Sequence, residues 1–191
     1  MDKADYSNIH LALVHFPVYN KVGEIVVSSV TTLDVHDISR VCRTYGAGSF
    51  YVVTPLKTQK ELVERMVGHW MKGFGAEYNP TRKDALQQTK VIKSLDEVIK
   101  ELTEQSGDKP RVVVTSAKEV PNSIGYKSLR EKLSEGGGPV LLVFGTGWGL
   151  EKNLIKNADY VLEPIQGNSG FNHLPVRGAI AIILDRLLGW Y

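Results

Sequence analysis

Two loops rich in glycine and polar residues follow apolar segments in the second half of this sequence of 191 residues. The first lies in PVLLVFGTGWGLE and places Gly145, Gly147 and Gly149 at alternating positions directly after an apolar run. Glycines allow a backbone to turn tightly and to approach a ligand without obstruction by side chains. The spacing matches neither the G-x-G-x-x-G dinucleotide loop nor the G-K-[ST] phosphate loop. We therefore expect a ligand loop of another kind, and a tight turn that binds nothing is the alternative.

The second loop lies in LEPIQGNSGFNHLPVRGAIAIILDRLLG, between Pro164 and Pro175. It is rich in Gly, Asn, Ser and His, although it connects two apolar elements that need no such polar side chains. The strands that precede the two loops are consecutive in the chain. We therefore expect the two loops to form two walls of one pocket.

A third candidate is the segment DVHDISRVCRTYG. On a helix, His36, Arg40 and Arg43 fall at i, i+4 and i+7 and share a polar face opposite an apolar stripe. Two arginines on one face suit phosphate recognition, because a guanidinium can donate two parallel hydrogen bonds to phosphate oxygens. The alternative is that Arg43 is solvated or paired with Asp37 or Asp34.

The elements that must position these residues alternate between apolar runs and amphipathic segments. Near-continuous Val, Ile and Leu runs indicate strands that helices cover on both faces. We predict an α/β fold with a mostly parallel sheet and helices on both faces, in one domain over 1–191, and ligands in such sheets bind outside the carboxyl ends of the strands. The expected strands are Ile9–Val14, Ile25–Val30, Phe50–Thr54, Thr89–Ile92, Arg111–Thr115, Val140–Phe144 and Tyr160–Leu162, and the expected helices are Asp34–Tyr45, Gln59–Met71, Ser94–Gln105, Lys127–Leu133 and Pro175–Leu188.

The composition is that of a globular protein, with 42% hydrophobic and 23% charged residues and a net charge of +2. No apolar stretch approaches the ~20 residues that a membrane span requires. The N-terminal residues carry no secretory-signal pattern, and the single Cys42 allows no internal disulfide, so we expect a cytoplasmic protein. The five histidines show no metal-ligand spacing, so we expect no metal site. A serine hydrolase is excluded because the G-x-S-x-G elbow is absent.

The near-neutral total hides a local basic surplus. Residues 51–100 hold nine basic and six acidic side chains, whereas the rest of the chain is nearly balanced. This surplus indicates either solvated helix faces or a docking patch for an anionic partner. Arg82 and Lys83, in NPTRKDAL, are candidate RNA contacts or helix-start charges, and Trp70 and Phe74 either stack on bases or pack against the core.

These motifs carry a family resemblance. The glycine loop VFGTGWGLE, the Pro-Ile-x-Gly loop at 164–167 and the Leu-x-Val of the following small-residue helix resemble, in order, the second and third motifs of the SPOUT RNA methyltransferases. Taken whole, with LVHFPVYNK near its start, the chain resembles the small stand-alone SPOUT family that also occurs fused to the tRNA guanine methyltransferase of bacteria.

The resemblance implies a C-terminal deep trefoil knot, S-adenosylmethionine as methyl donor and a homodimer with its sites at the interface. The apolar final helix, with Leu187, Leu188, Trp190 and Tyr191, suits such an interface. The cofactor residues that the resemblance implies are Phe144, Gly145, Thr146 and Gly147 for main-chain contacts, Ile165, Gly167, His173 and Leu174 for the opposite wall, and Thr115 and Ser116 for the adenine side.

The arginine-bearing segment resembles the first motif of the ribose-methylating SPOUT branch, with Arg43, Thr44 and Gly46 at the matching spacing. Asp37 stands where that branch has Asn, so ribose and base methylation both stay open. The resemblance implies that Arg43 engages the target hydroxyl or the adjacent phosphate. The catalytic candidates are Arg43, Asp37 and Arg40, with Asp37 or His36 as the base, and the RNA-binding candidates are Arg40, Arg43, Arg82 and Lys83.

The expected function is therefore methyl transfer from S-adenosylmethionine to an RNA, either tRNA or rRNA. The alternative is a non-catalytic module that binds S-adenosylmethionine and recruits or regulates an RNA-modifying partner. From pattern alone, a flavodoxin-like nucleotide-binding protein with unrelated chemistry is a third hypothesis.

Overall fold

A six-stranded parallel sheet forms the centre of the protein in the computed structural model, which describes residues 5–190. The order of its strands is β5-β4-β1-β7-β6-β8, and each neighbouring pair is parallel. All carboxyl ends therefore meet at one edge, which we call the carboxyl edge. The strands are β1 (Ile9–Val14), β4 (Phe50–Val53), β5 (Thr89–Ile92), β6 (Arg111–Thr115), β7 (Val140–Gly145) and β8 (Tyr160–Leu162).

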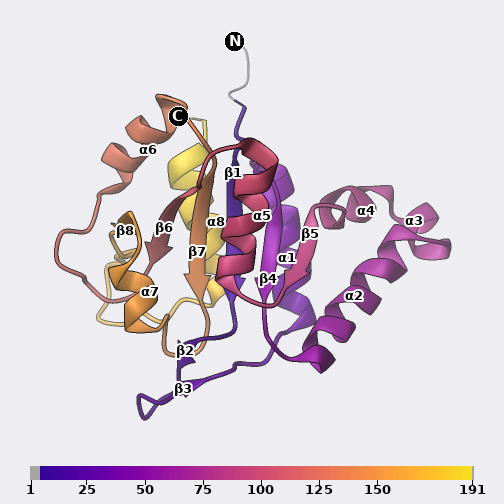
Figure 1. Cartoon of the computed structure of the whole chain (residues 1–191), viewed down its shortest axis with the longest axis horizontal. Helices are drawn as coiled ribbons and strands as arrows, with labels where there is room; N and C mark the ends of the chain where they lie inside the picture. The colour runs from indigo at the N-terminus through magenta and orange to yellow at the C-terminus, as the bar shows by residue number, and fades with distance from the viewer. Residues whose placement is uncertain (1–4, 191) are drawn as a thin grey trace.

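Helices cover both faces of this sheet (Figure 1). Helices α1, α6 and α8 pack on one face, α5 and α7 pack on the other, and α2, α3 and α4 extend from the side of the sheet that ends in β5. The helices are α1 (Thr32–Thr44), α2 (Lys57–Met71), α3 (Phe74–Tyr78), α4 (Pro80–Leu86), α5 (Leu95–Ser106), α6 (Tyr126–Ser134), α7 (Lys152–Lys156) and α8 (Val176–Leu188).

Strand β1 shows why the apolar runs are continuous. Leu11 and Leu13 belong to the hydrophobic core under α1 and α8, whereas Ala12 and Val14 belong to the core under α5. All four side chains are fully buried, because successive residues of a strand point to opposite faces and both faces are covered. The predicted α/β class with a mostly parallel sheet is thus confirmed.

One predicted strand is wrong. The run 25–30 was expected to be a strand, but only β3 (Ile25–Val26) forms, and it pairs antiparallel with β2 (Val18–Tyr19) in a separate hairpin. The hairpin cannot pair with β1, because β1 already has a parallel neighbour on each side, β4 and β7.

The final helix α8 buries most of its apolar residues against the rest of the chain. Leu187 and Leu188, which were expected to suit a dimer interface, lie in the core, whereas Trp190 is 85% exposed. Tyr191 lies outside the described residues. In the described part of the chain, no helix has both the length and the apolar character needed to cross a membrane.

Candidate functional site

The three predicted cofactor segments begin at the carboxyl ends of three adjacent strands. Strand β7 ends at Gly145, β6 ends at Thr115, and β8 ends at Leu162, two residues before the loop that starts at Pro164. The sheet order places β6 between β7 and β8, so the two polar loops are not on neighbouring strands. The loop after Thr115 lies between them and is a third potential wall of a pocket at the carboxyl edge.

The glycine loop is clamped to the β2–β3 hairpin. The Trp148 amide donates to the Tyr19 carbonyl, and the Tyr19 amide donates to the Gly149 carbonyl, each at 2.9 Å. Gly147 has φ +59°, and a Cβ at that position would lie 2.9 Å from the Tyr19 oxygen. A Cβ on Gly145 would lie 2.9 Å from the Leu150 nitrogen. Close packing against the protein itself therefore accounts for two of the three glycines.

A chain of hydrogen bonds fixes Thr146 of this loop to buried parts of the chain. Its Oγ1 donates to the Val14 carbonyl at 3.0 Å and also contacts the Ser28 hydroxyl, which in turn pairs with His15 Nδ1 at 3.0 Å. Burial lowers the pKa of His15 to about 4, so the ring is neutral at pH 7. His15 Nε2 is buried and has no hydrogen-bond partner within residues 5–190. His15 is thus a buried support of the glycine loop.

The second polar loop packs against the loop that follows β6. The Asn172 side chain donates to the Ala117 carbonyl at 3.0 Å, and the Gln166 side chain donates to Glu119 at 3.3 Å. Gly167 has open space where a Cβ would stand, and Leu174 is exposed. This wall therefore offers accessible backbone and an apolar side chain to a ligand.

The predicted adenine-side residues lie between the two walls. Thr115 Oγ1 donates to the Val143 carbonyl of β7 at 3.1 Å, which ties the end of β6 to the strand that leads into the glycine loop. Ser116 Oγ accepts a hydrogen bond from the Lys118 amide at 3.0 Å. Ile165 packs against the core beside them, while His173 makes an edge contact with the Phe171 ring.

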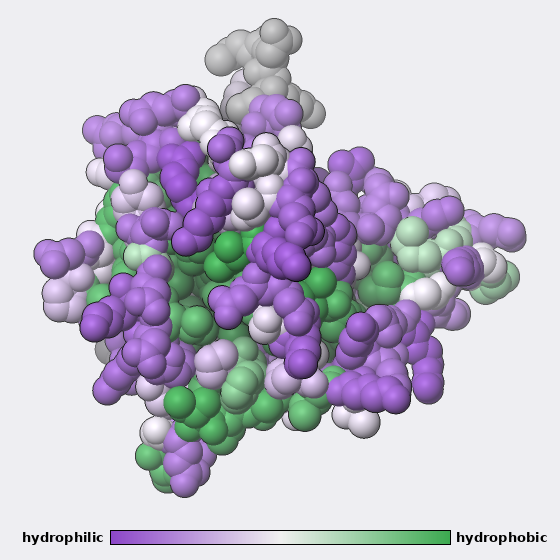
Figure 2. All heavy atoms as spheres, in the orientation of Figure 1, coloured by the Kyte–Doolittle hydropathy of each residue, from purple (hydrophilic) through white to green (hydrophobic). Residues whose placement is uncertain are grey.

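Hydrophobic side chains gather along the carboxyl edge next to these loops. Figure 2 shows them over the β2–β3 hairpin, whereas the outer surface of α5 is hydrophilic. The exposed residues include Phe16, Val22 and Ile25 around the hairpin and Trp148 in the glycine loop. The candidate cofactor loops are thus bordered by an apolar rim.

The predicted arginines converge in a separate groove between α1 and α4. Arg40 and Arg43 from α1 and Arg82 from α4 line it, and its volume is about 310 Å³. Arg43 Nε lies 2.7 Å from Asp84 Oδ2, so its partner is neither Asp34 nor Asp37. Lys83 is exposed on α4 and does not line the groove. The remaining lining residues are Thr44, Asn79, Thr81 and Ala85.

Asp34 and Asp37 instead pair with Arg177 of α8. Arg177 Nη1 lies 3.3 Å from Asp34 Oδ1, and Arg177 Nε lies 3.5 Å from Asp37 Oδ2. The sequence did not single out Arg177 or Asp84, because these contacts join residues that are far apart in the chain. One local signal was readable, since Asn79 and Pro80 form a standard helix start that brings Arg82 onto α4.

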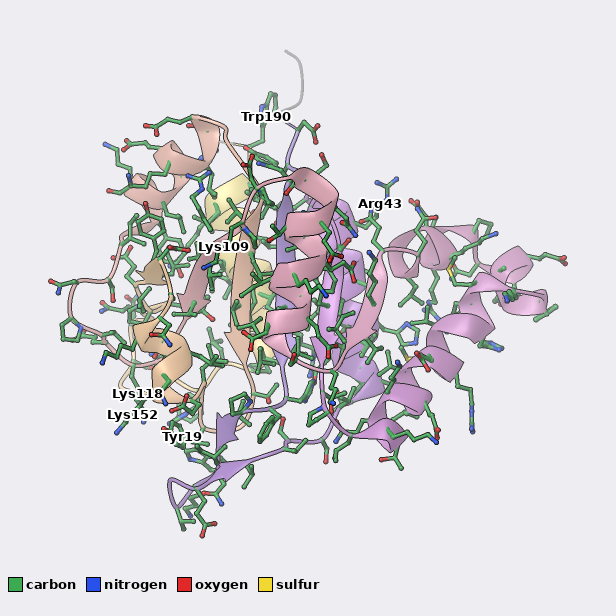
Figure 3. All side chains as sticks on the ribbon, in the orientation of Figure 1. Tyr19, Arg43, Lys109, Lys118, Lys152 and Trp190 are labelled. Atoms are coloured by element: carbon green, nitrogen blue, oxygen red, sulfur yellow. The ribbon has the colours of Figure 1, made fainter. Side chains whose placement is uncertain are left out.

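The arginine groove and the glycine loop lie at opposite ends of the chain's fold. In Figure 3, Arg43 stands near the amino-terminal edge of the sheet, far from Tyr19 and Lys152 at the carboxyl edge. The Lys152 amide donates to the Tyr19 hydroxyl at 3.3 Å, so these two residues mark the position of the glycine loop. The fold of this chain therefore does not bring Arg43 to the glycine loop.

Comparison with known proteins decides the family. Residues 8–189 match the model of a family described as SAM-dependent RNA methyltransferase. The chain belongs to this family. Its members are RNA methyltransferases that use S-adenosylmethionine, as the resemblance predicted.

Two relatives and one solved structure illustrate the match. An uncharacterized protein of Aquifex aeolicus is 41% identical over 94% of this chain and 88% of its own length. A tRNA (guanine-N(1)-)-methyltransferase of Oleidesulfovibrio alaskensis is also 41% identical, over 95% of this chain, but the chain spans only 42% of that relative's length. The structure of a TrmH/SpoU tRNA modifying enzyme from A. aeolicus matches 97% of this chain and 76% of its own, with a TM-score of 0.58 at 14% identity, which supports the same fold.

Proposed function

We propose that this enzyme methylates a tRNA or an rRNA, and that its methyl donor binds at the carboxyl edge where β7, β6 and β8 end. The observation that carries this placement is the alignment of all three predicted cofactor segments at the ends of three adjacent strands. Ligands of open parallel sheets bind at this edge. We extend the proposal to a single domain over 1–191, in line with the continuous sheet, and keep the cytoplasm as the compartment expected from the single cysteine.

The residues at this edge fit an adenosyl group. Such a group needs accessible backbone and apolar contacts, and the loops offer open backbone at Gly167 together with the side chains of Ile165 and Leu174. S-Adenosylmethionine, when bound, supplies an electrophilic methyl group. The residues that we propose to hold it are Phe144, Gly145, Thr146, Gly147, Ile165, Gly167, His173, Leu174, Thr115 and Ser116.

We further propose that the C-terminal segment forms a trefoil knot. The path of residues 163–175 supports it. The Glu163 carboxylate accepts a hydrogen bond from the Tyr126 amide at 3.0 Å, and Asn172 contacts Ala117, so the segment runs along the loop that joins β6 to α6. Helix α8 then packs on α1, near the centre of the sheet. Such a knot requires the chain to pass through an earlier loop, and a return from an edge strand to the centre along that loop supports this path.

The separation of the arginine groove from the glycine loop supports a homodimeric site. We propose that Arg43 acts at the cofactor loop of the second protomer, where it orients the target nucleotide. In a symmetric dimer each protomer would contribute its glycine loop to one site and its Arg43 to the other, which makes two equivalent sites.

Arg40 and Asp37 complete the proposed catalytic set. Arg40 lies in the same groove as Arg43, so it is placed to bind the same nucleotide. Arg177 fixes the orientation of the Asp37 carboxylate through their ion pair. Asp37 and His36 are both proposed as acceptors of the proton that the target group loses, because both lie on α1 beside the arginines.

Mixing two impaired variants tests whether the site is shared, at an S-adenosylmethionine concentration too low to fill the Gly147→Val loop. Arg43→Ala leaves the glycine loop intact, and Gly147→Val leaves Arg43 intact. If Arg43 acts across the interface, a mixed dimer has one complete site, and equimolar mixing restores about a quarter of wild-type methyl transfer. If both residues act within one protomer, the mixture stays inactive, and the shared site is wrong.

The non-catalytic module is the second hypothesis, and it concerns this chain acting alone. Its support is the match to less than half of the longer tRNA methyltransferases. A module would bind S-adenosylmethionine in calorimetry without transferring its methyl group to any RNA, whereas the proposed enzyme does both.

A further inference from the structure

The groove between α1 and α4 concentrates positive charge. Three guanidinium groups, those of Arg40, Arg43 and Arg82, line it, and Asp84 is the carboxylate among its lining residues. Arg43 pairs with Asp84. Within residues 5–190, Arg40 and Arg82 have no carboxylate at ion-pair distance, so the groove has a net positive charge without a ligand.

Stacking holds Arg82 in place. Its guanidinium carbon lies 4.4 Å from the centroid of the Trp70 ring, and the Asn79 side chain accepts from the Arg82 amide at 3.0 Å, which starts α4 at this position. Trp70 also contacts His36 of α1 edge-on, with 5.9 Å between ring centroids. A stacked guanidinium keeps its edge free for hydrogen bonds and has lost part of its side-chain freedom in advance.

The pKa of the neighbouring His36 reflects the positive charge of the groove. Its pKa is lowered by burial first, and then by the positive charges of Arg82 and Arg40. The ring is therefore neutral at pH 7 and does not itself supply the charge that attracts an anion. The arginines supply that charge.

We propose that this groove binds a phosphodiester group of the RNA substrate, and that Asp84 takes the place of this phosphate in the RNA-free protein. The inference deepens the proposed function, on which it rests. Arg43 and Asp84 are 49% and 43% exposed, so their ion pair is weak and Arg43 can exchange Asp84 for a phosphate at low cost. Bidentate hydrogen bonds to phosphate oxygens are the interaction that arginine forms best.

If a phosphate binds in the groove, substitutions of Arg82 and Asp84 should have opposite effects on RNA affinity. Arg82 supplies a donor to the phosphate, so its loss weakens binding. Asp84 competes with the phosphate for Arg43, so its neutralisation strengthens binding. If the cations attract RNA only through their long-range field, Asp84→Asn would also strengthen RNA binding. In that case, however, the loss of any arginine would weaken RNA binding to the same extent.

The test measures the affinity of bulk unmodified tRNA by fluorescence anisotropy at several KCl concentrations. For Arg82→Gln we expect a dissociation constant about tenfold higher and a salt slope about one unit shallower, since one phosphate contact is lost. For Asp84→Asn we expect at least threefold tighter binding, on the order of the coupling of one exposed ion pair. Arg65→Gln, at an exposed arginine of α2 outside the groove, is the matched control and should change affinity less than twofold; Arg65→Ala should behave in the same way.

Three results would overturn the proposal. One is an equal loss of affinity in Arg82→Gln and Arg65→Gln, and another is weaker tRNA binding by Asp84→Asn. The third is that inhibition by inorganic phosphate depends on Arg82 whereas tRNA affinity does not depend on it. That result would assign the groove to a free anion. Circular dichroism confirms that each variant is folded.

Calorimetry with S-adenosylmethionine on the same variants separates this proposal from the proposed function. If cofactor binding and methyl transfer are intact but the substitutions at Arg82 and Asp84 do not change tRNA affinity, the phosphate site is wrong and the proposed enzyme function still holds. Absent cofactor binding in the wild-type protein would remove the proposed function itself.

Discussion

The substitution Gly147→Val tests the glycine loop as the cofactor site. Gly147 has φ +59°, and the added Cβ would lie 2.9 Å from the backbone oxygen of Tyr19. Left-handed backbone costs a non-glycine residue about 1–2 kcal/mol. Relief of the close contact requires the Tyr19 carbonyl to move, at a further cost of about 1–3 kcal/mol. We expect the free energy of unfolding to fall by roughly 2–5 kcal/mol.

The same movement should weaken cofactor binding. Shifting Tyr19 breaks its hydrogen bond with the Trp148 amide and displaces the main chain that we propose to contact the adenosyl group. Loss of one or two such main-chain hydrogen bonds, at about 1 kcal/mol each, corresponds to a five- to thirtyfold rise in the dissociation constant of S-adenosylmethionine.

Gly107→Val is the matched control for this substitution. Gly107 ends α5 with φ +83° and has open space at its Cβ position, so valine there carries the backbone strain without the close contact. Urea denaturation should show a loss of about 1–2 kcal/mol, and calorimetry should show unchanged cofactor affinity. A Gly147→Val protein that is destabilised as expected but binds S-adenosylmethionine within twofold of wild type would refute the reasoning.

Three further predictions follow from the described contacts. Arg43→Ala should abolish methyl transfer to RNA while calorimetry shows unchanged cofactor affinity, and because its ion pair with Asp84 is half-exposed, urea denaturation should show a change below about 1 kcal/mol; a large loss of cofactor affinity would contradict the role of Arg43. Ser28→Ala should leave His15 Nδ1 without its partner, lower the free energy of unfolding by about 1–3 kcal/mol and weaken cofactor binding. Unchanged cofactor affinity would show that these hydrogen bonds do not support the cofactor site. Burial lowers the pKa of both His15 and His10 to about 4, so the unfolded state binds protons first as the pH falls. The free energy of unfolding should therefore be highest above pH 6.5 and roughly 2 kcal/mol lower at pH 5 for each histidine. A flat pH profile from urea denaturation would show that the rings are not buried as described.

The sequence predicted the central strands of the sheet because they are buried on both faces. The runs 9–14, 89–92, 111–115 and 160–162 form strands with the predicted bounds. The run 25–30 was misread, because an apolar run does not reveal whether a sheet edge is free to accept it, and Ile25 is exposed in a hairpin instead.

The candidate site was predictable residue by residue but not as an arrangement. The i, i+4, i+7 spacing correctly grouped Arg40 and Arg43 on one face of α1. It did not indicate that Arg82 would join them on Trp70, or that Asp84 would pair with Arg43, since both contacts depend on how α4 packs against α1. Local periodicity contains no information about such packing between distant segments.

Transfer of tritium from labelled S-adenosylmethionine to bulk unmodified tRNA and rRNA tests the central claim most directly. The wild-type chain alone should label one of these RNA pools with time, and nucleoside analysis should place the label in a single methylated nucleoside. Saturable binding of S-adenosylmethionine with no label in either pool would contradict the claim and favour the non-catalytic module.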